Sequence, residues 1–405
     1  MRLWSSVTVD FRSLRDVASA PCGARSHRGN AQRSEWMQKF WAATVAAAIA
    51  ACLAGPAFAQ DGKADWAKIV AAAEREGTLV LMSQPNQVFR NLIQTEWPKA
   101  YPKIALSVSV VPEQQFLTRI RVEREADKYL WDMGVAGASA GYILSKDGIV
   151  DPLLPEIVDA KTRDPALWGG WDEAFYDRAN KYVLSLTSYI ASPWFNTAHV
   201  SPAKVAQQGF KLLLDPEYKG KIAWHDPTVS GGGRNYIELM RKALGESGFK
   251  RFVQDQATIV AQQHQVVEEM ARDTAWIGIG PPVRSLLAPY AKAGVHIDVA
   301  TFGRDPAVAV SSTGGSTVYV FNRRPHPNAT RVFLNWLLSR DMQFKMATAM
   351  DQRSRREDVP ETGQPDSVPI KGAKYFAPQR EENLALQEKN MALVRELRSS
   401  SNSGK

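Results

Sequence analysis

A glycine-rich segment carries the residues best suited to bind a ligand: Ser230, Gly231, Gly232, Gly233 and Arg234. Glycine lets backbone N–H groups turn toward one point, and a helix that follows adds unpaired donors and a positive dipole end. Ser230 adds a hydroxyl, and Arg234 adds a guanidinium that can bind paired oxygens. The segment therefore predicts a pocket for phosphate, phosphonate, sulfonate or carboxylate. Three glycines before a helix are also typical of a flexible connection, and that interpretation stays open.

Small polar residues beside apolar runs form a second set of candidates: Ser83, Gln84, Ser139, Ser312 and Thr313. The first three follow expected strands, where ligands of open α/β sheets bind. The last two precede a strand, where they either line the pocket or serve as a hinge. Arg284 is a second candidate cation, and a surface ion pair is the alternative for both arginines. Four aromatic residues are expected either to stack on a ligand or to lie in the core: Trp194, Trp224, Tyr142 and Trp276.

The elements that must position these residues follow an α/β pattern. Apolar runs alternate with amphipathic stretches, as in parallel sheets covered by helices. The first set has expected strands at 78–82, 104–111 and 132–136, with helices at 65–76, 88–98 and from 112. The second set has strands at 222–224, 276–279 and 295–300, with helices at 203–214 and 236–244. Two β-prone stretches, 181–195 and 316–321, are expected to carry the chain into the second set and back.

The boundaries of this pattern divide the chain into four parts. Residues 60–189 and 316–350 are expected to form the first lobe, and residues 190–315 the second. Residues 351–405 are expected to wrap the surface, with a helix at 383–397 and a disordered tail from 399. Residues 1–59 precede the folded part.

The N-terminal segment has the features of an export signal. Lys39 precedes an apolar stretch at 40–54, and Ala57-Phe58-Ala59 offers a cleavage site, which predicts a secretory signal peptide and a mature chain from Gln60. Residues 1–36 are expected to be a leader or an extension ahead of a biological start at Met37. A lipoprotein-type site at Cys52, which would anchor the protein to a membrane, is the alternative. The expected location is the periplasm in either case.

Composition excludes several classes of function. The net charge is +8, but half of it lies in the first 59 residues, and the one dense basic run, Arg353, Arg355 and Arg356, is expected to be a solvated helix end or loop. No nucleic-acid partner is therefore expected. Both cysteines precede residue 60, so no disulfide is expected in the folded part. The GxSxG motif is absent and the histidines lack a recognisable partner pattern, so an enzyme is not expected.

The stretches that carry a resemblance cover nearly the whole mature chain: WAKIVAAAEREGTLVL (66–81), LLLDPEYKGKIAWHDPTVSGGG (212–233), WIGIG (276–280) and STVYVFNRRPHPNATRVFLNWLLSRDMQ (316–343). They resemble the type II periplasmic solute-binding proteins of ABC importers, in the branch with ferric-ion, thiamine, phosphonate and sugar-phosphate receptors. The resemblance implies a two-lobe α/β fold with two parallel-rich sheets, flanked by helices and joined by two crossing strands. It also implies a monomer that binds a small molecule between the lobes and delivers it to an inner-membrane permease.

The resemblance also allows a test for metal. Ferric-ion receptors of this family place two adjacent tyrosines after the strand corresponding to residues 276–279, whereas this chain has Gly280-Pro281-Pro282 there and no tyrosine before Tyr290. We therefore expect no metal, no cofactor and an anionic organic ligand. His225 and Asp226 lack a third partner at ligand spacing. A ferric or thiamine receptor, an exported enzyme acting on a small phosphorylated substrate and a sensor domain remain the alternatives.

Overall fold

The computed structural model describes residues 57–83, 86–229, 231–281, 287–295 and 297–402. Asp65–Lys405 forms one compact unit, separate from Met1–Ala64. The expected signal sequence up to residue 56, including both cysteines, and the site candidates Gln84, Ser230 and Arg284 lie outside the described residues. No helix within the described part of the chain is both long and apolar enough to cross a membrane.

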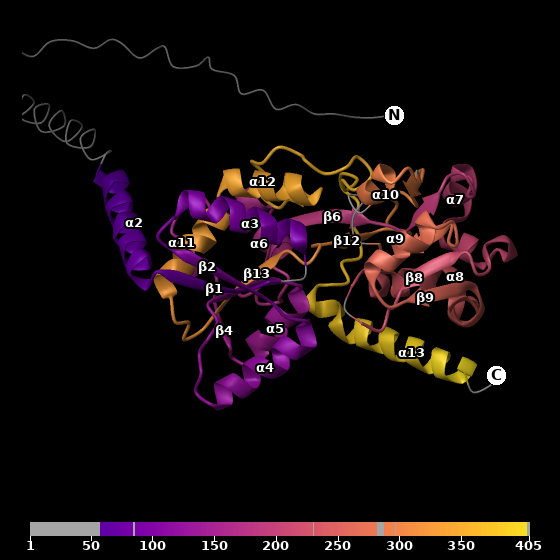
Figure 1. Cartoon of the computed structure of the whole chain (residues 1–405), viewed down its shortest axis with the longest axis horizontal. Coiled ribbons are helices and arrows are strands. Elements are labelled where there is room, and N and C mark those ends of the chain that lie inside the picture. The colour runs from indigo at the N-terminus through magenta and orange to yellow at the C-terminus, as the bar shows by residue number, and fades with distance from the viewer. Residues whose placement is uncertain (1–56, 84–85, 230, 282–286, 296, 403–405) are drawn as a thin grey trace, which may run out of the picture. The chain divides into compact units, whose positions relative to one another are not determined.

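The first lobe is built on a six-stranded sheet in the order β2-β1-β3-β13-β4, with β5 also paired to β13 (Figure 1). β1 pairs in parallel with β2 and β3, whereas β13 runs antiparallel to its neighbours. The strands are β1 (Thr78–Ser83), β2 (Ala105–Val110), β3 (Met133–Ala136), β4 (Val150–Asp151), β5 (Leu184–Ser185) and β13 (Thr317–Phe321). The helices of this part are α2 (Ala57–Glu76), α3 (Gln87–Ala100), α4 (Glu113–Glu125), α5 (Ala138–Lys146), α6 (Trp171–Ala174), α11 (Pro327–Leu337) and α12 (Arg340–Met350).

The second lobe is built on a five-stranded sheet in the order β11-β7-β10-β8-β9. β8 pairs in parallel with β9 and β10, and β7 is antiparallel to β10 and β11. The strands are β7 (Trp194–Asn196), β8 (Ile222–His225), β9 (Ala257–Val260), β10 (Ile277–Ile279) and β11 (Val299–Thr301). The helices are α7 (Pro202–Gln208), α8 (Ile237–Arg251), α9 (Gln263–Ala271) and α10 (Ala288–Lys292). Each sheet thus combines three parallel strands with antiparallel ones.

The connection between the lobes differs from the expectation at both crossings. The stretch 181–195 is not one strand but three, β5, β6 (Thr187–Ala191) and β7, and β6 makes the crossing. The return crossing is β12 (Val310–Ser312), which pairs antiparallel with β6, whereas the predicted return strand is β13 and lies inside the first sheet. β14 (Arg353–Ser354) pairs with the other edge of β6. Phe376 extends the sheet beyond β12, since its carbonyl accepts from the Ser311 N–H at 2.9 Å.

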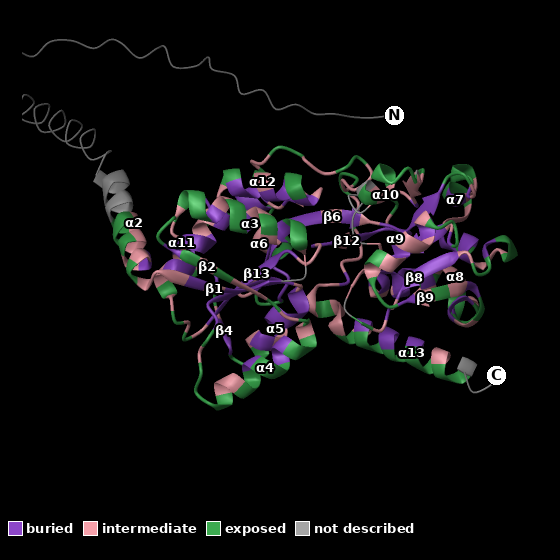
Figure 2. Cartoon of the chain, viewed as in Figure 1, coloured by how far each residue is buried: buried purple, intermediate pink, exposed green. Residues whose placement is uncertain are grey.

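The C-terminal region packs against the hydrophobic clusters of both lobes and does not only cover the surface. α13 (Leu384–Asn402) packs Leu384 against a first-lobe cluster and Met391 and Val394 into the second-lobe core. Residues 399–402 are helical rather than disordered, and the Ser400 hydroxyl accepts a hydrogen bond from Gln254. Most of the buried residues line the sheets and the inner faces of their helices (Figure 2).

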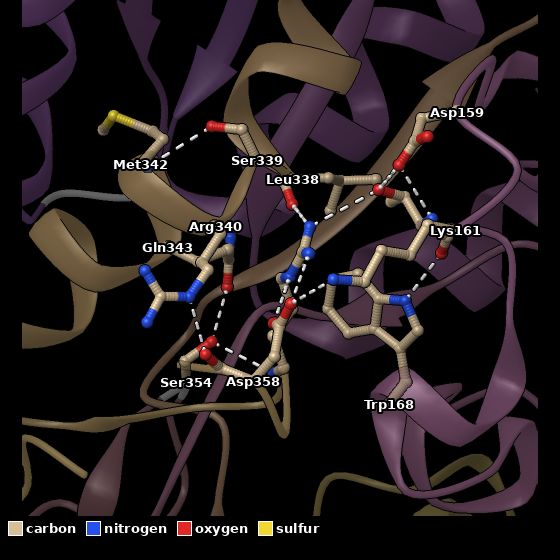
Figure 3. A network of polar contacts seen from close by, with 12 residues as sticks. Asp159, Lys161, Trp168, Leu338, Ser339, Arg340, Met342, Gln343, Ser354 and Asp358 are labelled. Carbon is tan, nitrogen blue, oxygen red and sulfur yellow. Dashed lines mark hydrogen bonds and ion pairs between the residues drawn. The ribbon is translucent and has the colours of Figure 1, made fainter. Parts of the chain in front are cut away.

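The basic run also differs from the expected solvated loop. Arg356 is 5% exposed, pairs with Asp358 at 2.9 Å and donates to the Leu338 carbonyl at 2.6 Å. Its neighbour Ser354 donates to Gln343, in a network that ties the segment after α12 to the first lobe (Figure 3). Arg356 therefore has a structural role, because a buried guanidinium is stable only when it is paired.

Candidate functional site

The glycine segment of the second lobe lies between the ends of β8 and β10. β8 ends at His225, and the 3₁₀ turn Gly232–Tyr236 leads into α8. A Cβ on Gly233 would lie 1.9 Å from the His225 carbonyl oxygen, and one on Gly280 would lie 2.5 Å from the Gly233 nitrogen. Only glycine permits these backbones to come so close, so the segment is a packed structure rather than a flexible connection.

The two polar backbone groups of Gly233 are both used by the protein. The Gly233 N–H donates to His225 Nδ1 at 3.3 Å, and its carbonyl accepts from the Trp224 indole at 3.0 Å. Burial lowers the pKa of His225; Asp226 opposes that shift and Arg234 adds to it. The imidazole is therefore neutral near pH 7, which leaves Nδ1 free to accept. Any anion held by this segment must bind through other groups.

Arg234 is the group in this segment that remains available. Its side chain is half-buried, and within the described residues no carboxylate pairs with it. Its charge acts on His225 beside it and on Tyr142 of α5 in the first lobe. A half-buried guanidinium without a counter-charge is costly, and a ligand anion would relieve that cost.

The first-lobe candidates lie at the carboxyl ends of their strands. Ser83 ends β1 and is fully buried, and Ser139 lies in the first turn of α5, just after β3. The Ser139 hydroxyl donates to the Glu113 carboxylate, at 2.7 and 2.8 Å from its two oxygens. Tyr142, one turn later, is buried and donates to the Gln379 carbonyl. Burial raises the pKa of Tyr142, so the hydroxyl remains protonated.

Ser312 and Thr313 are buried and occupied by the C-terminal segment. Gln379 Oε1 accepts from the Thr313 N–H at 2.9 Å, from the Thr313 hydroxyl at 3.1 Å and from the Ser312 hydroxyl at 3.4 Å. Gln379 therefore ties the return crossing to Tyr142 of the first lobe. Nothing in the sequence distinguishes this glutamine from others in the same region.

A cavity of about 50 Å³ is lined by the crossing strand β6, the second lobe and the segment after α12. Its wall includes Trp194, as the sequence suggests, together with aromatic and polar residues that sequence reasoning missed: Tyr189, Tyr236, Asp351, Gln352, Gln364 and Asp366. Pockets for organic ligands commonly span roughly 300–1,000 Å³, so an organic ligand requires the walls to part. Of the other aromatic candidates, Trp224 is buried in the core and Trp276 stacks on His199.

The groups named as metal candidates are engaged elsewhere. Asp226 accepts from the Thr228 N–H and hydroxyl and pairs with Arg398 of α13 at 3.0 Å, while His225 accepts from Gly233. Within the residues that the structure describes, no cluster of three or more His, Cys, Asp or Glu side chains could hold a metal ion.

Comparisons with known proteins identify the class that this chain is similar to. Residues 178–346 match the family described as bacterial extracellular solute-binding protein. No curated protein matches the sequence.

The whole fold is that of the type II periplasmic binding proteins. Iron-bound HitA from Pseudomonas aeruginosa has a TM-score of 0.62 and 15% identity, over 79% of this chain and 99% of that one. The polyamine-transporter protein PotD from Streptococcus pneumoniae has a TM-score of 0.58 and 12% identity, over 79% and 99%. AfuA from Actinobacillus pleuropneumoniae, with fructose-6-phosphate bound, has a TM-score of 0.54 and 15% identity, over 80% and 99%. At these identities the similarity concerns the fold.

Proposed function

We propose that this protein is the periplasmic substrate-binding component of an ABC importer and captures a small organic solute that bears an anionic group. The family match at residues 178–346 and the shared fold support the class. The observation that carries the anionic ligand is Arg234, half-buried and without a carboxylate partner in the described part of the chain. The ligand site comprises Arg234, residues 231–233 and the facing loops of the first lobe.

Binding and delivery follow from closure of the two lobes. The ligand anion pairs with Arg234 on the second lobe, and contacts with the first lobe become available as the lobes close. The ligand therefore favours closure through the contacts that it makes only in the closed state. The protein changes no covalent bond of the solute, acts as a monomer, and presents the closed form to a permease in the inner membrane.

A thermal-shift screen of the purified protein tests this function. Phosphate, alkylphosphonates, sugar phosphates, sulfonates and dicarboxylates form one arm, and thiamine, polyamines and ferric citrate form the other. A cognate anion should raise the unfolding midpoint. A response to cations or ferric citrate alone would reject the anionic ligand, and turnover of a phosphorylated probe would identify an enzyme instead.

The variant Arg234→Gln tests whether a rise in the unfolding midpoint comes from a ligand bound at Arg234. Loss of a charge-assisted hydrogen bond removes about 1.5–3 kcal/mol, so affinity should fall roughly 10-fold to 150-fold. Arg272→Gln is the matched control, because Arg272 is exposed at the end of α9. Binding to Arg234→Gln with wild-type affinity would remove Arg234 from the site.

A further inference from the structure

Arg355, in the basic run after α12, has a largely buried guanidinium that donates no hydrogen bond within the described residues. Its side chain is 15% exposed, and its Nε is buried without a partner. The carboxylate oxygen that pairs with it, Glu173 Oε2, is 4.0 Å from its Nη2, which is too far for a hydrogen bond. Every N–H of this guanidinium is thus left for another acceptor.

Other buried arginines of the first lobe use their donors. Arg324 also has a buried Nε without a partner, but its two Nη atoms contact Glu156 at 2.6 Å and Asp151 at 2.9 Å. Arg356 pairs with a carboxylate at 2.9 Å and donates to a backbone carbonyl at 2.6 Å. A desolvated guanidinium without hydrogen bonds is costly, so an acceptor from outside the chain would stabilise Arg355.

Arg380 brings a second guanidinium to the same carboxylate oxygen. Its side chain is 18% exposed, and its Nη2 is 3.5 Å from Glu173 Oε2, at the limit of hydrogen bonding. Arg380 also donates to two backbone carbonyls of α6, at 2.8 and 3.0 Å, and its Cζ lies 5.0 Å from the centre of the buried Tyr176 ring. These contacts hold the guanidinium in place, and two arginines therefore converge on one oxygen.

Glu173 is a weak partner for two buried cations. Its side chain is 69% exposed, and an ion pair with so exposed a carboxylate contributes little. Arg353, the third arginine of the region, does not share it, since it pairs with Glu357 at 3.3 Å and Glu361 at 3.1 Å. One exposed carboxylate thus covers two largely buried guanidiniums, and it can rotate away at little cost.

We propose that Arg355 and Arg380 form an oxyanion site on the first lobe, which a phosphate, sulfate or carboxylate group enters by displacing the Glu173 side chain. Such a group can accept from both guanidiniums with different oxygens, whereas Glu173 faces both with one. The group belongs either to a free ion or to an organic molecule. The site shares no residue with the ligand site at Arg234, and the inference does not rest on the proposed function.

Titration with inorganic phosphate tests the site, with chloride at matched ionic strength as the reference. The rise in the unfolding midpoint of the purified protein with phosphate concentration gives the dissociation constant. All measurements use the Arg234→Gln background, so that binding at Arg234 does not contribute. On this background Arg355→Gln should weaken phosphate binding at least about tenfold, the effect of losing a charge-assisted hydrogen bond.

Glu173→Gln should change the affinity in the opposite direction. It removes the carboxylate that phosphate must displace, so phosphate should bind about two- to fivefold more tightly. Glu246→Gln is the matched control, because Glu246 is 70% exposed and pairs with Arg241 on the second lobe. This control should leave the phosphate affinity unchanged. Because Glu173 is exposed, its variant tests the site even if Arg355→Gln fails to fold.

The outcomes separate this site from the one at Arg234. If phosphate stabilises the wild type but not the Arg234→Gln background, the oxyanion site is rejected and the proposed function stands. The oxyanion site is also rejected if chloride raises the midpoint as much as phosphate, or if neither Arg355→Gln nor Glu173→Gln changes the phosphate affinity. Ethyl phosphate distinguishes the two sources of the group: tighter binding than phosphate identifies an organic molecule, and equal or weaker binding identifies a free ion.

Discussion

Two short loops, at residues 231–234 and 312–315, look alike in sequence and differ in their use of polar groups. In the second, the Ser312 and Thr313 hydroxyls bind Gln379, and each also accepts a backbone N–H from Gly314 or Gly315 at 3.2 Å. In the first, Gly233 is held by His225 and Trp224, but Arg234 has no acidic partner in the described residues. Small polar residues alone therefore do not mark a ligand site, and we place the proposed ligand at the unpaired charge of Arg234.

Alanine substitutions at one glycine of each loop should give the largest difference in stability between the two loops. In Gly233→Ala the new Cβ meets backbone atoms of His225, which cannot move aside, whereas in Gly314→Ala it meets the side-chain amide of Gln352. We expect about 3 kcal/mol of destabilisation for Gly233→Ala, and about 1 kcal/mol for Gly314→Ala from its positive φ. Urea unfolding measures both. Equal losses would mean that the two loops are equally constrained.

Thr313→Val should lower stability without changing affinity. It removes a buried hydroxyl that donates to Gln379 and accepts from Gly315, which costs about 2 kcal/mol. Ligand affinity should stay at the wild-type value, because this loop binds the C-terminal segment. An affinity loss as large as that of Arg234→Gln would place the 312–315 loop at the ligand.

Acidification should weaken the 231–234 loop through His225. Its folded-state pKa is lowered by burial, so the unfolded chain takes up a proton first, near its ordinary pKa of about 6.5. This contribution to stability is complete above about pH 6.5 and declines as the pH falls toward the folded-state pKa. Protonated Nδ1 also cannot accept from Gly233, so ligand affinity should fall only as the pH approaches the lowered folded-state pKa. His225→Gln, which does not titrate, should flatten that part of the plot of stability against pH. An unchanged plot would exclude His225 as the cause of the pH dependence.

Arg398→Ala should have the smallest effect on the free energy of unfolding. Arg398 is 40% exposed and joins α13 to Asp226, just ahead of the glycine segment. Partly exposed ion pairs contribute less than about 1 kcal/mol, and salt reduces that further. Unfolding measured at low and high salt checks this. A larger loss, or a change in ligand affinity, would show that α13 controls the loop.

The strands that the sequence predicts best are buried runs in the parallel parts of the sheets. The runs at 78–82, 132–136 and 222–224 match β1, β3 and β8 closely, because such strands are apolar on both faces. β9 was missed, since Ala257–Val260 is short and lies between polar residues. The stretch 181–195 was predicted as one strand, because β-propensity does not show where the chain leaves one sheet for the next.

The site was only partly predictable for a related reason. The glycine spacing points to residues 231–234 because close backbone approach demands a residue type that the sequence shows directly. The roles of Glu113 and Gln379 depend on contacts with Ser139 and Tyr142, which lie 26 and 237 residues away. Neither residue belongs to a local pattern, so only the fold shows that Glu113 binds Ser139 and that Gln379 binds Ser312 and Thr313.

A crystal structure of the protein with the probe that gives the largest rise in unfolding midpoint tests the central claim most directly. We predict that the anionic group of the probe lies within hydrogen-bonding distance of the Arg234 guanidinium, beside residues 231–233. An anion bound at residues 312–315, or a bound probe without contact to Arg234, would contradict it.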